Sequence, residues 1–559
     1  MGEPINQAQS AKITSGNFYT PENSAFYSKF HYSDLDPKTD NIRLLRIKRP
    51  DPANPQQATI DCDLIDSVSL ASYKDKYTTI SYCAGSPKNI EPIIVNGCSF
   101  NAFANLGHAL RQARYFWRDK FDEQELLLWA DQVCINQSSH LERSHQVRLM
   151  GEIYAASARV LVSLSTENDI GGSIEWLETV LPDLRKAVQH QDYFSDPGRL
   201  AVEFFSNNLA DEYFHLGWNA FICTFLKSSW WSRAWIRQEF IRSPDAYLMA
   251  KFHWINWKGA AEFIGIYDSI ELEKPIVIYE PNQWAGHPPS CQACSFCGDS
   301  YLFMPVLDAQ PASTLLTAKT RAESQPGRFG DLLDHISDVD ICVSSDSRDL
   351  VYALLGISNH DYGLYPDYSP GVTLEDIVCQ LARNVISHNK SLDVLTMAYW
   401  NSSTASVPSW VPDLRSYSLF RSGRPIEQNT QFNAAVFSPS FHSDGKGRKD
   451  RVLRVQGVRH EVLRRKIKSK WTRKFLSTTG EGLRIMGLAQ EGDEIWMLHG
   501  SSTVFILREK DKQHYEIVGA VPYPDEILDA APLRLHRLRQ DINRLVESND
   551  PKVEFINLC

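Results

Sequence analysis

The sequence comprises 559 residues, of which 43% are hydrophobic and 23% are charged, an ordinary composition for a globular protein with a large core. No apolar run approaches the ~18–20 residues that a membrane-spanning helix needs, and the polar N-terminus lacks the apolar region of a signal peptide. Eleven cysteines in so long a chain do not form the dense pattern of a secreted disulfide scaffold, so we expect a cytoplasmic protein without membrane partners.

The first part of the chain alternates between strand and helix signals. Its first 40 residues show no sustained periodicity, which is typical of an irregular arm. Residues 42–47 alternate loosely and predict an edge strand, whereas residues 77–83 are rich in β-branched and aromatic side chains and predict a central strand. An Asn-Gly pair at 96–97 predicts a hairpin, and apolar spacing over residues 104–117 predicts a helix.

A strand–helix–strand unit follows. Residues 126–130 are a continuous apolar run, which predicts a strand buried on both faces. Residues 141–158 have helical spacing, and residues 159–164 form a second apolar run, so the unit is βαβ. The polar residues at the end of its first strand are Asp131, Asn136 and Gln137. In an open parallel sheet, ligands bind at this end of the strands.

Helical patterns dominate the next part of the chain. Residues 174–190 and 199–226 predict helices that lead to a tryptophan-rich helical segment at 228–242. A strand at 247–251 and a helix at 257–267 follow. This order of elements predicts an α/β domain built on a parallel sheet.

The remainder of the chain changes character twice. Residues 280–330 are rich in Pro, Gly, Ser and Cys and indicate an insertion, after which residues 332–356 and 374–388 have helical patterns. From about residue 436, short alternating stretches predict a small antiparallel β module that ends in a helix at 531–547. The predicted boundaries are 1–40 for the arm, 41–268 for the α/β domain, 269–400 for the insertion and helical region, and 401–559 for the C-terminal β-rich module.

Polar residues gather where the predicted parallel strands end. The strand ends after Ser81 and Asp131 should form one rim of the sheet, which the tryptophan-rich helix would close. Carboxylates, a hydroxyl and an arginine at such a rim can bind a ribose or a phosphate and stabilise developing charge. The predicted site residues are Ser81, Tyr82, Gly85, Asp131, Asn136, Gln137, Glu142, Arg143, Trp235 and Glu239. The alternative is structural: amides that cap the following helix, and surface charges.

Two further segments carry site signals of their own. Cys291, Cys294 and Cys297 could hold a structural zinc ion, although a single cluster of this kind is also typical of a reduced cysteine loop. The overall net charge is −10, yet residues 446–474 contain 13 Lys or Arg and only 2 acidic residues. Clustered cations beside an aromatic residue suit nucleic-acid binding, and a solvated basic face is the alternative. The predicted nucleic-acid-binding residues are Arg464, Arg465, Lys468, Lys470 and Trp471.

Three motifs stand in order along the chain. They are Thr79-Ile-Ser-Tyr82 with Gly85, Leu128-Trp-Ala-Asp-Gln-Val-Cys-Ile-Asn-Gln137, and Trp231-Ser-Arg-Ala-Trp235 with Gln238-Glu239. Together they resemble the fungal heterokaryon-incompatibility (HET) domain, and the resemblance extends over roughly residues 40–415. Two positions depart from the pattern of that family: Ala84 stands where a Trp is usual, and Ser165 where a Gly is usual.

The resemblance implies a fold and a chemistry. HET domains are similar to TIR domains, which have a flavodoxin-like fold, and several TIR domains cleave NAD at its glycosidic bond through a Glu that follows a Trp. Trp235-Ile-Arg-Gln-Glu239 is similar in spacing, which implies Glu239 as a catalytic residue. Asp131 and Tyr82, from the predicted rim of the sheet, complete the predicted catalytic set. No Gly-x-Gly-x-x-Gly motif is present, so NAD would be a substrate, and the sequence establishes no cofactor. If Arg233 and Arg237 lie close to Glu239, they should keep its carboxylate ionised.

Three functions therefore remain open. The first is a fungal incompatibility or cell-death effector that hydrolyses NAD. The second is a HET-like scaffold recruited to specialised metabolism as an aminoacyl-tRNA-dependent transferase or cyclodipeptide synthase, for which the basic segment would bind tRNA. The third is a non-catalytic interaction domain. A nucleotide or tRNA is the expected ligand, and a homo-oligomer is compatible with all three.

Overall fold

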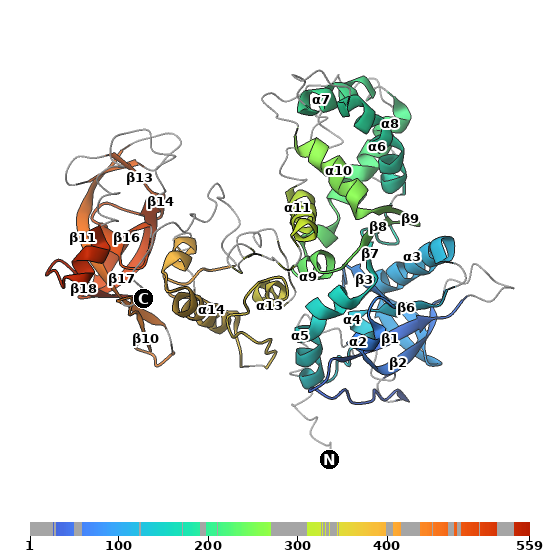
Figure 1. Ribbon diagram of the computed structural model, residues 1–559, viewed down its shortest axis with the longest axis horizontal. Helices are drawn as coiled ribbons and strands as arrows, with labels where there is room; N and C mark the ends of the chain where they lie inside the picture. Colours follow the sequence, from blue (N-terminus) through green and yellow to red (C-terminus); the bar gives the residue numbers. More distant parts are fainter. Residues whose placement is uncertain are drawn as a thin grey trace, which may run out of the picture. The chain divides into compact units, whose positions relative to one another are not determined.

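The computed structural model describes most of the chain from residue 26 onward (Figure 1). The described ranges are 29–49, 59–121, 124–169, 171–189, 197–208, 211–269, 310–325, 346–369, 371–398, 406–414, 436–449, 451–467, 474–477, 482–501, 503–521 and 541–559, with a few single residues between them. The chain divides into two compact units. Unit 1 comprises residues 1–329 and 342–359, and unit 2 comprises residues 330–341 and 360–559.

Unit 1 is built on a mixed sheet. Among its described residues, nine strands pair in the order β5-β4-β2-β1-β6-β3-β7-β8-β9. The strands are β1 (Asn41–Ile47), β2 (Asp61–Ser69), β3 (Thr78–Tyr82), β4 (Ile90–Val95), β5 (Cys98–Phe103), β6 (Leu126–Trp129), β7 (Arg159–Ser163), β8 (Ala246–Ala250) and β9 (His253–Asn256). Only β6, β3, β7 and β8 form a continuous parallel set. The prediction of a parallel sheet was therefore wrong for the outer strands, where β1–β2, β4–β5 and β8–β9 pair antiparallel.

The predicted central strand, β3, is confirmed by its burial. All five residues of β3 are buried, as expected for a strand with helices on both faces. The predicted edge strand at 42–47 was wrong, because β1 lies between β2 and β6. Its Arg43 is fully buried and forms two hydrogen bonds to Glu142, of 2.6 and 3.0 Å. A neutralised arginine thus gave a buried strand the sequence pattern of an edge.

Short turns and helices connect these strands. The predicted hairpin is confirmed as β4–β5, whose turn residues Asn96 and Gly97 both have positive φ, as a type I′ turn requires. The βαβ unit is also confirmed, with β3 inserted between its strands β6 and β7. The helical elements of unit 1 are α2 (Leu70–Tyr73), α3 (Ala104–Phe121), α4 (Asp131–Cys134), α5 (His140–Ala156), α6 (Ser173–Gln189), α7 (Pro197–Asn208), α8 (Glu212–Ala220), η3 (Phe221–Leu226), η4 (Ser229–Ser232), α9 (Ile236–Ile241), α10 (Trp257–Asp268), α11 (Gln310–Ser324) and α13 (Asp349–Leu355).

One of these helices lies within the predicted insertion at 280–330. Helix α11 occupies residues 310–324 and packs against α9 and α10. Its Lys319 is buried and donates hydrogen bonds of 2.7 Å to the carbonyl oxygens of Phe240 and Ser243 at the end of α9. This contact satisfies backbone acceptors that a helix end leaves unpaired. None of the helices that the structure describes is both long and apolar enough to cross a membrane.

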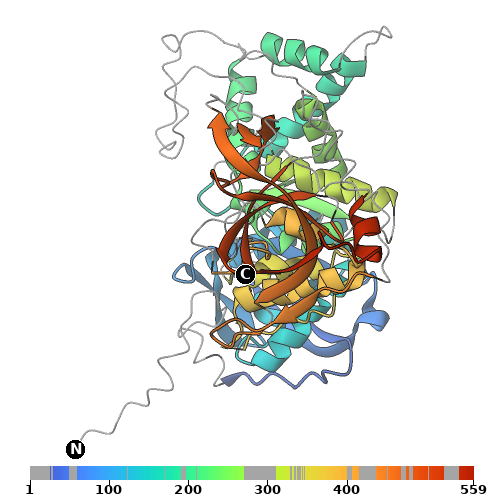
Figure 2. The same ribbon diagram turned by 90° about the vertical axis from the view of Figure 1, so that its left-hand side faces the viewer.

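Unit 2 combines a helical part with a β module, as predicted. The helical elements are α14 (Leu374–Asn389) and η8 (Asp393–Met397). The strands are β10 (Ser440–His442), β11 (Val452–Ile467), β12 (Lys474–Ser477), β13 (Gly482–Arg484), β14 (Met486–Gly487), β15 (Glu494–Leu498), β16 (Val504–Asp511), β17 (His514–Val521) and β18 (Glu554–Leu558). Strands β11, β15, β16 and β17 pair in succession, and β18 pairs with both β17 and β11. These pairings close a ring of strands, whose curvature is visible in red and orange in Figure 2.

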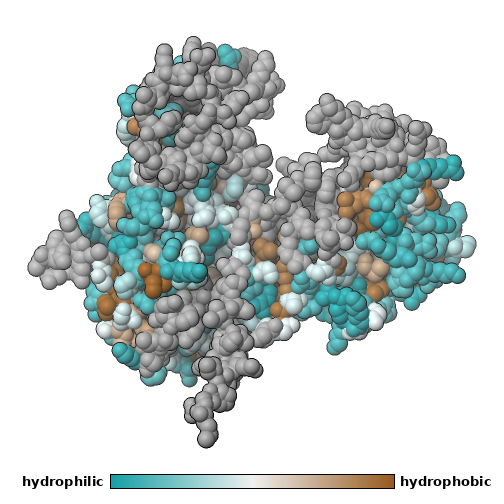
Figure 3. Space-filling view, turned by 180° about the vertical axis from the view of Figure 1, so that it is seen from behind, coloured by the Kyte–Doolittle hydropathy of each residue, from teal (hydrophilic) through white to brown (hydrophobic). Residues whose placement is uncertain are grey.

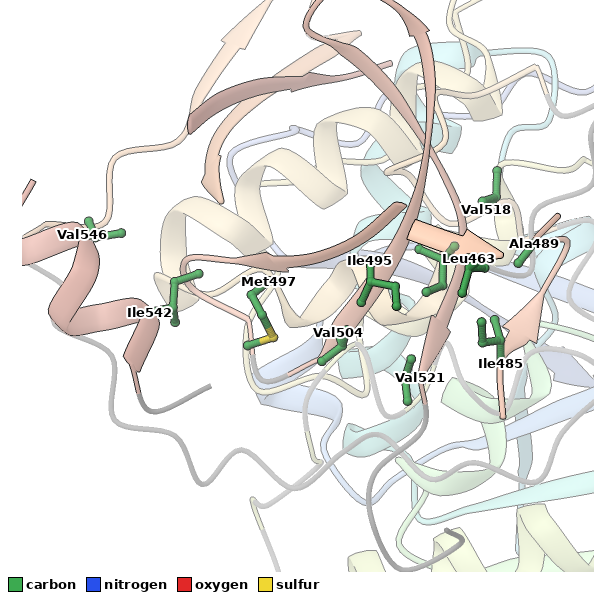
Figure 4. Close-up of a cluster of buried hydrophobic side chains, with 11 residues drawn as sticks. Leu463, Ile485, Ala489, Ile495, Met497, Val504, Val518, Val521, Ile542 and Val546 are labelled. Atoms are coloured by element: carbon green, nitrogen blue, oxygen red, sulfur yellow. The ribbon is translucent and has the colours of Figure 1, made fainter. Parts of the chain in front are cut away.

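The ring encloses its own hydrophobic core. Figure 4 shows this cluster, to which β11, β15, β16 and β17 contribute, with Ile542 and Val546 of the terminal helix at one end. The two helical residues are spaced i, i+4 and therefore share one face. On the face seen in Figure 3, the outer surface of the module is mainly hydrophilic. The predicted antiparallel β module is thus confirmed, although β18 was missed and is parallel to β17.

Candidate functional site

The structure brings the carboxyl ends of β3 and β6 together. These strands are parallel neighbours, so Tyr82 at the end of β3 lies close to Asp131, which follows β6. The Tyr82 hydroxyl donates a hydrogen bond of 2.9 Å to Asp131 Oδ1, which also accepts one of 2.8 Å from the backbone N–H of Gln132. The rim that the sequence predicted from Ser81 and Asp131 is thus present in the sheet.

The tryptophan-rich segment places a second carboxyl group at this rim. Glu239 lies on α9, and its Oε2 accepts a hydrogen bond from the Ser81 hydroxyl. Ser81 Oγ in turn accepts a hydrogen bond of 2.7 Å from the indole Nε1 of Trp230, on η4. Ser228 fixes this turn to the sheet, because its hydroxyl donates to the carbonyl oxygen of Leu164, at 2.7 Å.

Arg233 supplies positive charge between the two acids. Its Nη1 lies 3.8 Å from Glu239 Oε2 and also donates to the carbonyl oxygen of Tyr82. Its side chain is only 17% exposed, so solvent screens the interaction with Glu239 weakly. We call Ser81, Tyr82, Asp131, Trp230, Arg233 and Glu239 the Glu239 cluster.

Burial sets the protonation of the cluster. It raises the pKa of Glu239 to about 7, and the charge of Asp131 adds to the rise, while Arg233 and the Ser81 hydroxyl oppose it. Burial also raises the pKa of Asp131, against the opposing effects of Arg233 and Tyr82. The expectation that Glu239 stays fully ionised therefore fails, because desolvation outweighs the nearby cation. A carboxyl group that exchanges its proton near pH 7 is suited to acid–base chemistry.

Comparison with known families assigns this region. Residues 77–239 match the family described as Heterokaryon incompatibility protein (HET). Residues 77–239 thus form a HET domain. The match begins next to β3 and ends at Glu239, so the HET domain contains every member of the Glu239 cluster.

A relative extends the likeness beyond the HET domain. Heterokaryon incompatibility protein 6, OR allele, of Neurospora crassa is 24% identical over 457 residues, which are 73% of this chain and 61% of that protein. The aligned region thus spans less than two thirds of the relative's length. No solved structure matches this chain.

Other predicted residues of the HET domain make structural contacts. Gln137 Nε2 donates to the carbonyl oxygen of Asp131, at 2.8 Å, and Asn136 Oδ1 accepts from the Ser138 hydroxyl, at 2.6 Å. Glu142, besides binding Arg43, accepts a hydrogen bond of 2.7 Å from the Asn136 backbone N–H. These contacts shape the loop after β6, so they hold the rim in place.

The remaining predicted residues lie at the borders of these elements. Gly85 is exposed and has a φ of +74°, and a Cβ atom there would lie 2.7 Å from Asn105 Nδ2, so the turn after β3 favours glycine. Trp235 is half-buried and directly precedes α9, and Arg143 is half-buried on α5. The sequence prediction missed Trp230, and it treated Arg233 only as a neighbouring charge. The tryptophan-rich pattern marked the segment, but only the fold shows which indole reaches Ser81.

A second polar cluster follows β7. His108 Nε2 lies 3.1 Å from the Ser165 hydroxyl, and His108 Nδ1 lies 3.0 Å from Glu167 Oε2. Ser165 Oγ also accepts hydrogen bonds from Gln112 Nε2, at 3.0 Å, and from the Lys251 backbone N–H, at 2.8 Å. We call this group the Ser165 cluster. Its signal in the sequence was the Ser165 position, together with the i, i+4 spacing of His108 and Gln112 on α3.

The predicted metal and nucleic-acid sites fall mostly outside the described residues. Cys291, Cys294 and Cys297 lie outside them, and the described part of the chain contains no group of three or more His, Cys, Asp or Glu side chains that could hold a metal ion. Lys468, Lys470 and Trp471 also lie outside, as does the side chain of Arg465. Arg464 is exposed on β11.

Proposed function

We propose that this HET-domain protein acts in heterokaryon incompatibility and that it does so by hydrolysing NAD at the glycosidic bond, with Glu239 as the catalytic carboxylate. The observation that carries the proposal is the environment of Glu239. Glu239 as a residue is 2% exposed, and its carboxyl group has a pKa raised to about 7 and lies beside a hydroxyl and a guanidinium. The name of the Neurospora crassa relative supports the biological role.

The strand order supports a ligand site at this place. The parallel strands β6-β3-β7-β8 are second, first, third and fourth along the chain, which is the order in flavodoxin-like folds. In such sheets the ligand lies beyond the carboxyl ends of the strands, where successive connections leave in opposite directions. Here that switch point lies between β3, the first strand, and β7, the third. Ser81 and Tyr82 at the end of β3 border it, and Asp131 follows β6 on the other side of β3.

The proposed reaction needs the ionised form of Glu239. The bond between the ribose anomeric carbon and the nicotinamide nitrogen breaks, and its electron pair leaves with nicotinamide. The carboxylate stabilises the positive charge on the anomeric carbon, and water then adds to it and passes a proton to Glu239. The products are nicotinamide, ADP-ribose and one proton. Asp131, held by Tyr82, would accept hydrogen bonds from ribose hydroxyls and orient the substrate.

On β11, one of three exposed arginines is paired with an acid, which lowers the charge available to a tRNA. Arg454, Arg459 and Arg464 are exposed along β11, but Arg459 Nη1 is 2.8 Å from Glu494 Oε1 and is thereby neutralised. Phosphate binding gains its free energy from unpaired cations that displace counterions. An aminoacyl-tRNA-dependent transferase is therefore the second candidate, and the experiment includes its substrate.

The test compares wild-type protein with Glu239→Gln and Asp131→Asn, each incubated with NAD and, separately, with aminoacyl-tRNA. Glu239→Gln should retain the fold and lower the rate of nicotinamide release by ~10²-fold or more, whereas Asp131→Asn should lower it less. The wild-type rate should rise with pH through about 7, as Glu239 ionises. Full NAD cleavage by folded Glu239→Gln would contradict the assignment. Consumption of aminoacyl-tRNA alone would support the second candidate, and consumption of neither substrate would leave an interaction domain.

A further inference from the structure

The Ser81 hydroxyl has one partner that can only donate a hydrogen bond and another that accepts one. An indole Nε1–H can only donate a hydrogen bond, so Ser81 Oγ must accept the one from Trp230. The hydroxyl hydrogen is then directed to the other partner, Glu239 Oε2. The chain Trp230–Ser81–Glu239 therefore has one direction, from indole to carboxylate.

This direction makes the two oxygens of the Glu239 carboxyl group unequal. Ser81 and Arg233 both approach Oε2. A proton on Oε2 would displace the Ser81 hydroxyl hydrogen from its acceptor and would add positive charge beside Arg233. A buried donor without an acceptor is unfavourable, so the proton belongs on Oε1.

Packing around Trp230 keeps the direction fixed. The indole is fully buried, and its ring contacts Trp231 and Phe240 at centroid distances of 4.9 and 5.8 Å. Phe240 directly follows Glu239 on α9, so the same packing holds the helix and the indole. Neither the indole nor the carboxylate can turn without disturbing a close-packed core.

We propose that Trp230 and Ser81 are positioning residues that hold Glu239 Oε2 as a permanent hydrogen-bond acceptor and leave Oε1 to exchange the proton with substrate or water. The part of this inference that concerns substrate rests on the proposed function. The part that concerns the carboxyl group itself does not depend on any reaction. The two parts can therefore be tested separately.

The first test is a titration of the Glu239 carboxyl carbon in full-length protein labelled with ¹³C at glutamate Cδ, with Glu239→Gln used to assign the signal. Ser81→Ala removes the donor to Oε2, which should move the titration midpoint up by about one pH unit. Trp230→Phe frees the Ser81 hydroxyl to turn away and should move the midpoint in the same direction by less. Ser81→Thr retains the hydroxyl and should restore the wild-type midpoint.

A neighbouring tryptophan provides the matched control. Trp231 is also buried, but its Nε1 donates to the carbonyl oxygen of Phe225, at 2.6 Å, and not to the Glu239 cluster. Trp231→Phe therefore makes the same chemical deletion in the same core and should leave the midpoint unchanged. An unchanged midpoint in Ser81→Ala, or equal movement in Trp230→Phe and Trp231→Phe, would overturn the proposal.

The second test uses the reaction. If NAD is the substrate, the pH profile of kcat in Ser81→Ala should move by as much as the carbon titration, with KM nearly unchanged. Movement of the titration in a protein that does not cleave NAD would reject the proposed function and leave the positioning role standing. Movement of KM alone, without the titration, would instead reject the positioning role.

Discussion

The Glu239 cluster and the Ser165 cluster follow neighbouring parallel strands and contain similar groups. Each places a buried serine against a base, and each has an arginine nearby. The Ser165 cluster even has the order of a Ser-His-Glu triad. Its serine, however, already has three partners, which use its one hydrogen and both lone pairs. The arrangement thus resembles a triad, but the hydrogen-bonding capacity of its serine is already fully used.

The acids of the two clusters differ in their exposure and in the direction of their pKa shifts. Glu167 has a side chain that is 66% exposed, and although burial opposes the change, hydrogen bonds from Arg111 and His108 hold its pKa below its usual value. Glu239 is buried, and burial holds its pKa near 7. The candidate carboxyl group is distinguished here by a desolvation cost that its neighbours do not offset, and less by the types of its neighbours.

The largest expected difference between the clusters is in NAD cleavage. Glu239→Gln should reduce the rate by ~10²-fold, whereas Glu167→Gln should reduce it by less than ~3-fold, because only the buried carboxylate is proposed to face the reacting carbon. Nicotinamide release measured on both variants under identical conditions checks this. Equal losses would mean that the two clusters act as one site.

The next effect concerns stability. His108 is 1% exposed and bridges Ser165 and Glu167, so His108→Leu should leave the Ser165 hydroxyl hydrogen without an acceptor and cost about 2 kcal/mol of unfolding free energy. Urea unfolding at pH 7, followed by tryptophan fluorescence, measures this loss. A variant as stable as wild type would show that the Ser165 cluster is not a structural network.

A third expected effect is a pH-dependent gain in stability when Glu239 is replaced. Because the pKa of Glu239 is raised from 4.5 to about 7 in the folded state, the folded protein binds more protons than the unfolded chain between these pH values. Glu239 therefore lowers stability progressively as pH rises from about 4.5 to about 7. Glu239→Gln removes this term, so the variant should gain roughly 1–3 kcal/mol relative to wild type between pH 5 and pH 8. A constant difference across that range would contradict the raised pKa.

The sequence predicted best those strands that contain no buried charged side chain. Strands β6 and β7 come from apolar runs and β3 from β-branched and aromatic residues, and the central position of β3 and the burial of β6 were expected. Strand β1 was misplaced because Arg43, whose charge is neutralised by Glu142, gave a buried strand a polar pattern. Of the outer antiparallel pairs, the β4–β5 hairpin was predicted from its Asn-Gly turn, whereas the pairing of β1 with β2 and with β6 was not.

Part of the candidate site could also be predicted from the sequence. Ser81, Tyr82, Asp131 and Glu239 were named from their positions at strand ends and in a motif, and the fold brings them together. The role of Trp230 depends on the direction in which its indole points from a turn. The spacing of residues along the sequence does not give that direction. The pKa of Glu239 depends on how much water the whole domain excludes, so a nearby arginine in the sequence was a poor guide to it.

The closure of the β module by β18 has a consequence for biosynthesis. Strand β11 begins at Val452, but its partner β18 comprises Glu554–Leu558, so the ring stays open until this segment has left the ribosome. Until then the edges of β11 and β17 that β18 covers, and the apolar side chains inside the ring, have no native cover. Pairings so distant in sequence form slowly, and open strand edges invite association with other chains. The nascent module therefore passes through an interval in which its own last strand does not yet shield it.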